Sequence, residues 1–162
     1  EDFYQSMKEL AMTASDVRYW NGAFGHPTES EIVTMGYGRY ATVTSTKQTF
    51  RHTGVDYHTP KGTEILAMND GVVVYTGAFD YSGKLVVIEH GFGLKTWYAH
   101  LDSISVSVGD SVKKGDVLGI GGTSGFASDN ANHYAVHTEM TVFNIPVCPY
   151  TAQDRGIPMY TR

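Results

Sequence analysis

A histidine and an aspartate four residues apart, His52 and Asp56, form the first motif that could carry out chemistry. Gly54 lies between them and lets the backbone bend, so the imidazole and the carboxylate can converge on one cation. Zinc accepts this mixed set of nitrogen and oxygen ligands. On its own the His-x-x-x-Asp spacing is a weak signal, and further ligands elsewhere in the chain are needed to make it a metal site.

Two further histidine motifs lie later in the chain. His100 follows an apolar segment, where a histidine is commonly a hydrogen-bonded core residue. Residues 132–140 read NHYAVHTEM, and a strand here would place alternate side chains on one face, namely His133, Ala135, His137 and Glu139. Two histidines on one strand face are unusual as packing residues, because each needs hydrogen-bond partners when buried. This segment therefore indicates a functional face.

The elements that must position these residues are mostly strands. Phe3, Met7, Leu10 and Ala11 recur at helical spacing and predict a helix within residues 1–20, the only helix we expect. An irregular connection with glycine and proline follows over residues 21–31. The later apolar runs are short and bounded by Gly, Asp or Ser; they cover residues 65–68, 72–75, 85–89, 95–100 and 103–108. The NDG sequence at residues 69–71 predicts a hairpin turn between the first two runs.

The composition agrees with an all-β domain. The 162 residues correspond to about one domain, and they include 16 Val, 17 Thr, 11 Tyr and 18 Gly against only 6 Leu. Short strands with frequent turns predict a small antiparallel β-sheet that closes as a barrel or sandwich. We divide the chain into an N-terminal helical and irregular segment, residues 1–33, packed on a main domain, residues 34–162.

Charge and cysteine content exclude several other classes. The net charge is −5 and the basic clusters are no longer than pairs, which argues against a nucleic-acid partner. The single cysteine, Cys148, excludes an intrachain disulfide and a cysteine-based zinc knuckle. Its apolar surroundings predict a buried side chain. No apolar run approaches the ~20 residues of a transmembrane helix.

Taken together in their order along the chain, the motifs resemble those of the lysostaphin-type (LytM-type) zinc metallopeptidases, whose domain is a small antiparallel β-sheet groove. The resemblance covers roughly residues 34–150. The matching segments are RHTGVDY at residues 51–57, GTEILA at 62–67, DGVV at 70–73, VIEHGFG at 87–93, YAHL at 98–101, VGDSVKKG at 108–115, the glycine-rich 119–125, and HTE at 137–139.

The resemblance implies a role for each of the motif residues. His52, Asp56 and His137 match the three ligands of a zinc ion (Zn2+), which leaves a fourth position for water as catalytic zinc requires. His100 matches the non-ligand histidine that faces this water or the scissile carbonyl. Glu139 either orients His137 from the far side of its ring, as carboxylates commonly do for ligand histidines, or is a plain polar residue at a strand end.

One position departs from the family pattern. The family carries a His-x-His pair that ends at the last ligand, and the first histidine of this pair is replaced here by Ala135. His133 lies two residues earlier on the same predicted face, about 7 Å along the strand. Whether His133 takes the vacant catalytic role stays open. The resemblance therefore predicts an intact metal site and a damaged catalytic site.

The other histidines are not expected to bind metal. We expect His58 at the rim of the site, His90 in a turn and His26 in the irregular connection. The aromatic residues of the N-terminal segment have two interpretations of equal weight, as an interface or as packing onto the main domain; they are Tyr4, Tyr19, Trp20 and Phe24.

Two functions of different classes follow from the resemblance. An active zinc endopeptidase would hydrolyse peptidoglycan cross-bridges, with His100 as general base. The function we expect instead is that of the stage II sporulation protein Q group, with weak or no cleavage. Such a domain acts in spore engulfment by binding a stage III sporulation protein AH-type ectodomain across the intermembrane space. It would then lie outside the cytoplasm, anchored in the forespore membrane by a segment upstream of Glu1.

A swinging-arm carrier is the third hypothesis. DGVV at residues 70–73 and VGDSVKKG at 108–115 also resemble biotinyl and lipoyl domains. Those domains need a lysine at a tight hairpin tip between the two halves, and the nearest candidate, Lys84, has poor surroundings for that role. This hypothesis is therefore the weakest of the three.

Overall fold

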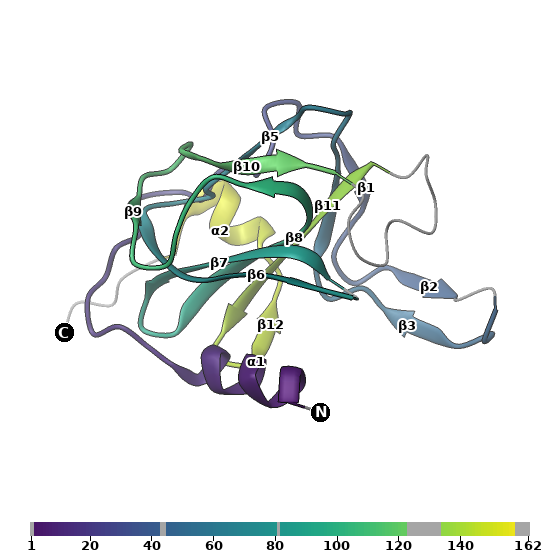
Figure 1. Ribbon diagram of the computed structural model, residues 1–162, viewed down its shortest axis with the longest axis horizontal. Coiled ribbons are helices and arrows are strands. Elements are labelled where there is room, and N and C mark those ends of the chain that lie inside the picture. The colour runs from purple at the N-terminus through teal and green to yellow at the C-terminus, as the bar shows by residue number, and fades with distance from the viewer. Residues whose placement is uncertain (1, 43–44, 81, 123–133, 158–162) are drawn as a thin grey trace.

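The computed structural model describes residues 2–42, 45–80, 82–122 and 134–157 (Figure 1). The helices within them are α1 (Asp2–Met12) and α2 (Tyr150–Arg155). The strands are β1 (Val33–Met35), β2 (Tyr40–Thr42), β3 (Thr49–Arg51), β4 (Val55–His58), β5 (Glu64–Leu66), β6 (Gly71–Phe79), β7 (Gly83–Gly91), β8 (Leu94–Ile104), β9 (Ser111–Val112), β10 (Val117–Gly121), β11 (Ala135–Val142) and β12 (Ile145–Val147). The predicted all-β class is confirmed.

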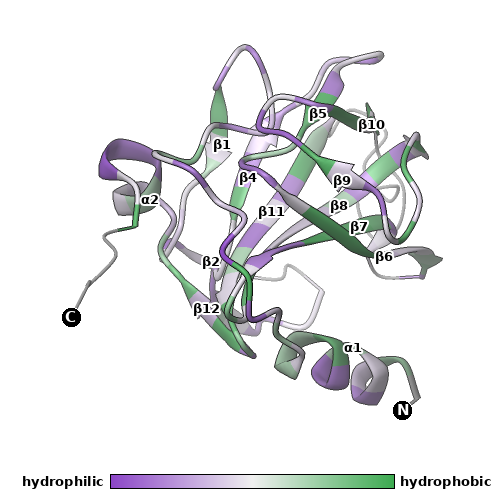
Figure 2. Cartoon of the chain, turned by 90° about the vertical axis from the view of Figure 1, so that its left-hand side faces the viewer, coloured by the Kyte–Doolittle hydropathy of each residue, from purple (hydrophilic) through white to green (hydrophobic). Residues whose placement is uncertain are grey.

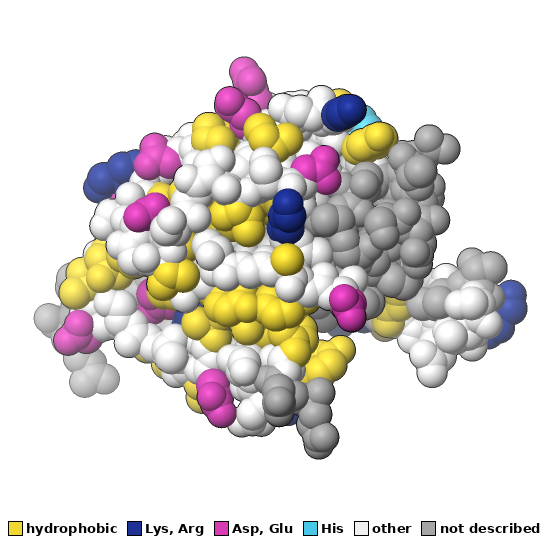
Figure 3. Space-filling model, in the orientation of Figure 1, with side chains coloured by type: hydrophobic (Ala, Val, Ile, Leu, Met, Phe, Trp, Pro, Cys, Tyr) yellow, Lys and Arg dark blue, Asp and Glu magenta, His cyan; other side chains and the backbone are white. Residues whose placement is uncertain are grey.

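Most strands belong to one antiparallel sheet. Its main path runs β1-β4-β11-β8-β7-β6-β9, while β12 pairs with β11, and β10 pairs with both β5 and β8. Strand β8 is the central element, because its first part pairs with β7 and β11 and its second part with β10. Strands β2 and β3 form a separate two-stranded ribbon that stands away from the body (Figures 1 and 3).

The sheet has two unlike faces. Its inner face packs the main core of fully buried side chains, among them Val55, Tyr57, Val86, Ile88, Tyr98, Leu101, Leu118 and Val136. The alternate residues of the same strands point to the other side, which we call the outer face. There Leu85, Val87 and Ala99 form a second, smaller cluster that packs against Met7 and Leu10 of α1. Helix α1 therefore covers part of the outer face. Figure 2 shows apolar residues on β6 and β7, and Figure 3 shows a band of hydrophobic side chains between β6 and α1.

The N-terminal segment is joined to the sheet by backbone hydrogen bonds. The amides of Tyr19 and Trp20 donate to the carbonyl of His90, and the amide of Phe24 donates to that of Ala152. The side chains of Trp20 and Phe24 are buried in the main core. These two aromatics therefore pack onto the main domain, which was one of the two interpretations. Tyr4, in contrast, is 69% exposed on α1. In the part of the chain that the structure describes, no helix is long and apolar enough to span a membrane.

Several local predictions were wrong. A second helix, α2, exists; the sequence did not reveal it because six residues are too few to show apolar periodicity. The NDG sequence does not join a hairpin: β5 pairs with β10 while β6 pairs with β7 and β9, and Asn69 is buried and binds the amides of Asn21 and Asp70. Cys148 is exposed, because it follows the edge strand β12, where one side faces solvent.

Candidate metal centre

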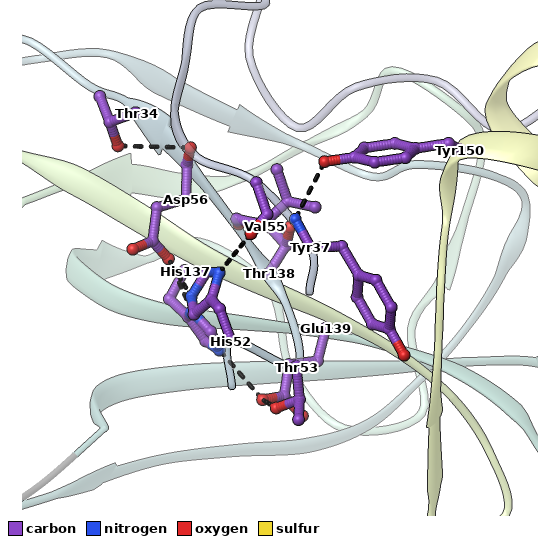
Figure 4. Close-up of polar contacts among 11 residues, drawn as sticks. Thr34, Tyr37, His52, Thr53, Val55, Asp56, His137, Thr138, Glu139 and Tyr150 are labelled. Atoms are coloured by element: carbon purple, nitrogen blue, oxygen red, sulfur yellow. Dashed lines mark hydrogen bonds and ion pairs between the residues drawn. The ribbon is translucent and has the colours of Figure 1, made fainter. Parts of the chain in front are cut away.

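His52, Asp56 and His137 lie together on the outer face. Strands β4 and β11 are neighbours, and their register places Asp56 directly opposite His137. His52 enters from the segment between β3 and β4. The Nδ1 atom of His137 is 2.6 Å from Oδ1 of Asp56 and 3.2 Å from Nε2 of His52, and the latter atom is 3.3 Å from Asp56 Oδ1 (Figure 4). Three potential ligand atoms from distant parts of the sequence thus converge.

Gly54 allows this convergence by close approach to β11. A Cβ atom at this position would lie 2.2 Å from the carbonyl oxygen of Thr138, 2.6 Å from Cε1 of His137 and 2.9 Å from Cγ of Glu139. Any side chain would push the segment that carries His52 away from β11. Gly54 lies at a bend, as predicted, and its close approach to β11 is a second reason why a residue without a side chain is needed here.

Hydrogen bonds outside the cluster fix which nitrogen of each ring faces it. Nδ1 of His52 donates to the carbonyl oxygen of Gly36 (3.0 Å), so in the neutral ring the lone pair is on Nε2. Nε2 of His137 donates to Oε1 of Glu139 (3.1 Å), which turns Nδ1 toward Asp56. Thr53 also donates to Glu139 Oε1 (2.9 Å) and holds the carboxylate in place. Both imidazoles are thereby oriented as metal ligands are.

The charges of the cluster are strongly coupled. Burial opposes the charged form of His137, but hydrogen bonds and Coulomb attraction from Asp56 and Glu139 outweigh it and raise the pKa to about 9. Burial likewise raises the pKa of Asp56, yet hydrogen bonds from His137 and His52 hold it well below its ordinary value. The pKa of Glu139 is also lowered, since its contact with His137 outweighs burial. Without a metal ion, a proton on His137 balances one of the two carboxylate charges beside it.

These residues fit a metal ion such as zinc. Two nitrogens and one carboxylate oxygen form a donor set that zinc accepts, and ligand atoms about 2.0–2.1 Å from a tetrahedral zinc lie about 3.3 Å apart. The two contacts of His52 Nε2 match this spacing, and the third is shorter because a hydrogen bond joins His137 and Asp56. All three atoms lie within 4.8 Å of one another, and each residue is at least partly buried.

His100 faces the cluster because of an irregularity in β8. Strict alternation would place it on the face opposite to Ala99, which pairs with His137. The register between β7 and β8 shifts at this point, and His100 has φ +65°, which is unusual for a residue other than glycine. Its ring centroid lies 6.4 Å from that of His137. The irregularity thus returns the side chain to the vicinity of the candidate ligands.

The segment around residue 135, where the family pattern has a histidine, is only partly described. Ala135 is buried and pairs with His58, whose side chain is exposed at the end of β4. His133, the suggested replacement, lies outside the described residues. Glu139 is on the same face as His137, as the alternation predicts, and their hydrogen bond shows it.

The remaining histidines have other partners. His90 was expected in a turn, but it lies in β7 and is completely buried, because both ring nitrogens find partners in the core. Its Nδ1 is 2.8 Å from the carbonyl oxygen of Asp70, and its Nε2 is 2.7 Å from Oγ1 of Thr96. His26 contacts the hydroxyl of Tyr57 and lies 3.6 Å from Glu31. Neither belongs to the candidate metal centre.

Sequence reasoning missed the residues that support His52. The carbonyl of Gly36 binds its ring, and the next amide, that of Tyr37, is held by the hydroxyl of Tyr150 (2.9 Å) at the start of α2. Backbone bonds between residues 38–39 and His52 complete the support. No local signal could have found them, because carbonyl and amide groups are present at every position.

The chain is similar to known peptidases over most of its length. It is 38% identical over 114 residues to the peptidoglycan DD-endopeptidase ShyA of Vibrio cholerae, covering 70% of this chain and 25% of that protein. The chain spans about a quarter of the length of the curated relatives it matches.

Solved structures share the fold. A peptidase M23 structure from Pseudomonas aeruginosa has a TM-score of 0.74 and 25% identity, covering 94% of this chain and 59% of that one. The catalytic domain of lysostaphin from Staphylococcus simulans has a TM-score of 0.64 and 26% identity, with 75% and 91% covered. A chain in the crystal structure of the SpoIIIAH and SpoIIQ complex has a TM-score of 0.66 and 25% identity, with 79% and 98% covered.

The family assignment follows from the sequence match together with this fold. The peptidase family M23 matches residues 50–147, which include the three candidate ligands, His100 and Ala135. This match spans more than half of the 162 residues, so the chain belongs to peptidase family M23.

Proposed function

We propose that this domain binds zinc through His52, Asp56 and His137 and hydrolyses peptide bonds of peptidoglycan slowly. The convergence of three oriented ligand atoms on the outer face carries the proposal. When bound, zinc would act as a Lewis acid, which polarises a peptide carbonyl and lowers the pKa of water. The substrate class is supported by the similarity to the peptidoglycan DD-endopeptidase ShyA.

The chain's own residues have separate tasks in this reaction. His52, Asp56 and His137 hold the ion, while Gly36 and Glu139 keep the two rings in the orientation that metal binding needs. The ring of His100 lies 6.4 Å from that of His137, and His100 is the residue that transfers a proton. A histidine suits this task because its ordinary pKa is close to neutral pH.

Ala135 is the reason for a slow reaction. Its methyl group cannot donate or accept a proton, and it stands where the family pattern has a histidine. A general acid or base is typically worth about 10²–10⁴-fold in rate. With His100 alone, we expect hydrolysis to be weak.

The test is the release of soluble peptides from purified peptidoglycan, measured with the native protein and with His52→Ala and His100→Ala variants. We expect slow release that a chelator, His52→Ala and His100→Ala each abolish. Release at the native rate in the presence of chelator, or in the His52→Ala variant, would contradict a zinc-dependent reaction.

A second candidate function is the binding of a protein partner. The similarity to a chain of the SpoIIIAH and SpoIIQ complex supports it, and so does the loss of a catalytic histidine at Ala135. In this function the domain lies outside the cytoplasm, anchored in a forespore membrane, and binds a SpoIIIAH-type ectodomain. The zinc ion would then hold β4 and β11 together rather than act in catalysis.

Co-elution with a SpoIIIAH-type ectodomain in size-exclusion chromatography tests this second function. We expect a complex with the native protein and a weaker one with the His52→Ala variant. The absence of a complex with native, zinc-loaded protein would reject the partner function. Hydrolysis would then be the one proposed function that remains.

A further inference from the structure

A cavity of about 220 Å³ lies beside the candidate metal centre, between α1 and strands β8, β11 and β12. Its lining includes Tyr4, Met7 and Lys8 from α1, Trp97 from β8, Glu139 from β11 and Pro146 from β12. It is smaller than the ~300–1,000 Å³ of sites that enclose a whole small molecule, so it suits one or two residues of a longer chain.

The cavity shares one residue, Glu139, with the surroundings of the metal centre. One oxygen of this carboxylate accepts the hydrogen bond of His137 Nε2 (3.1 Å), and the same side chain lines the cavity. Trp97 lies opposite Glu139 in the β8–β11 register, and its Nε1 donates to Thr141 Oγ1 (2.8 Å). Glu139 therefore belongs both to the support of His137 and to the wall of the cavity.

The wall formed by α1 is fixed in place. Lys95 is completely buried, and its ammonium donates to the carbonyl oxygens of Ala11 and Thr13 at the end of the helix. Glu89 pairs with Lys95 at 3.1 Å and accepts the amide of Ser15 at 2.9 Å. A buried ion pair whose donors and acceptors hold backbone groups is costly to break from one side.

Apolar contacts hold the rest of the helix. The ring of Phe3 lies 4.1 Å from that of Phe79 on β6, and Met7 and Leu10 pack on the second cluster. Helix α1 is thus anchored to the sheet at both ends and along one face, which places Tyr4, Met7 and Lys8 at the cavity.

The lining specifies the chemistry of an occupant. Trp97, Met7 and Pro146 offer an apolar surface for an aliphatic side chain. Lys8 supplies a cation on the exposed side of α1, while the Glu139 carboxylate accepts the hydrogen bond of His137. An anionic group is attracted to Lys8 and repelled by Glu139, so Lys8 is the lining residue that a carboxylate would pair with.

We propose that this cavity is a subsite for an aliphatic, carboxylate-bearing peptide terminus, such as the end of a peptidoglycan stem peptide. Tyr4 and Trp97 contact the aliphatic side chain, and Lys8 pairs with the carboxylate. The proposal rests on the proposed function for the kind of peptide that is bound, and it makes Tyr4 and Lys8 residues that determine specificity.

Trp97 provides a direct measurement of occupancy. A stem tetrapeptide with a free C-terminal carboxylate and its C-terminal amide are titrated into the zinc-loaded protein while tryptophan fluorescence is recorded. The other tryptophan, Trp20, is buried in the main core and serves as an internal background. We expect a change of emission with the acid form that the Trp97→Phe variant lacks.

Substitutions on α1 then identify the contacts. Lys8→Gln should weaken binding of the acid about twofold to fivefold, the size of an exposed ion pair, and leave binding of the amide unchanged. Tyr4→Ala should weaken both forms about threefold to tenfold. Lys61→Gln is the matched control, because it removes the same charge from an exposed lysine in the turn before β5.

The outcomes separate this proposal from the proposed function. No fluorescence change with either peptide, or equal effects of Lys8→Gln and Lys61→Gln, would overturn the subsite even if peptidoglycan is hydrolysed. Binding with the expected variant effects would support the subsite even if hydrolysis is absent, since the fluorescence does not depend on turnover.

Discussion

Two histidines of this domain, His137 and His90, lie on opposite faces of the same sheet and show opposite behaviour. His137 faces a carboxylate on each side, Asp56 and Glu139, and these raise its pKa to about 9 despite burial. His90 is enclosed in the core, where burial lowers the pKa to about 4 although the carbonyl and charge of Asp70 oppose this shift. The residue type is the same, and the partners decide its chemistry.

The hydrogen bonds around His90 explain why it is not a ligand. The amide of Met68 donates to the Tyr98 hydroxyl, and the carbonyl of Asp70 can only accept from His90 Nδ1. Between these two ends, Tyr98 donates to Thr96 and Thr96 donates to His90 Nε2. Each nitrogen is therefore satisfied inside the chain. Around His137, in contrast, lone pairs of three residues point at one place, and a cation or a proton is needed to hold them together.

Restoring the missing histidine beside the candidate metal centre should change the rate of hydrolysis strongly. Ala135→His restores the family's His-x-His pair and should raise the rate of peptide release from peptidoglycan by about 10²–10⁴-fold. Ala135→Gln is the control, since glutamine has a similar size but does not titrate. Equal rates for the two variants, with both still binding zinc, would show that position 135 does not limit hydrolysis.

Acid is expected to destabilise the fold through His90. The unfolded chain binds a proton on this histidine at a pKa of about 6.5, whereas the folded chain does so only at about 4. The stabilisation by neutral His90 is thus fully present above pH 6.5 and is lost as the pH falls toward 4, by about 3 kcal/mol.

Denaturant unfolding of metal-free protein between pH 7 and pH 4 measures this loss. The His90→Gln variant keeps a donor and an acceptor but does not titrate, so its free energy of unfolding should fall less steeply over the same range. If the native protein and the variant have the same slope, the charge state of His90 does not contribute.

A smaller effect is expected from the residue that supports His137. Glu139→Gln removes the negative charge that fixes the proton on Nε2, and it should weaken zinc binding about 10–100-fold. Competition with a chelator of known affinity measures this change. Glu64→Gln, an exposed substitution on β5, is the control for net charge. An unchanged affinity in Glu139→Gln would make Glu139 a plain surface carboxylate.

Strand alternation predicted part of the site from the sequence. It placed His137 and Glu139 on one face, and the composition gave the all-β class. The facing of Asp56 and His137 depends on the β4–β11 register, which local periodicity does not contain. The position of His100 depends on an irregularity in β8, and alternation alone would place it on the wrong side.

The errors have similar causes. Asn69 is in a turn typical of hairpins, but strand pairing is decided by the whole sheet, and β5 joins β10 instead. Residues 95–100 lie in a strand as predicted, but nothing in that run indicates that Lys95 is completely buried against Glu89 and the end of α1. The burial of Lys95 and of His90 therefore depends on partners that are distant in the sequence.

The zinc content of protein purified without chelator tests the candidate metal centre most directly. We expect one zinc ion per chain in the native protein and in the His90→Gln variant, and a large loss in His52→Ala and His137→Ala. Binding should also weaken in acid, because protons compete for the ligand histidines. Native protein that neither contains nor takes up zinc, or a His52→Ala variant that retains it fully, would contradict the assignment of the metal centre.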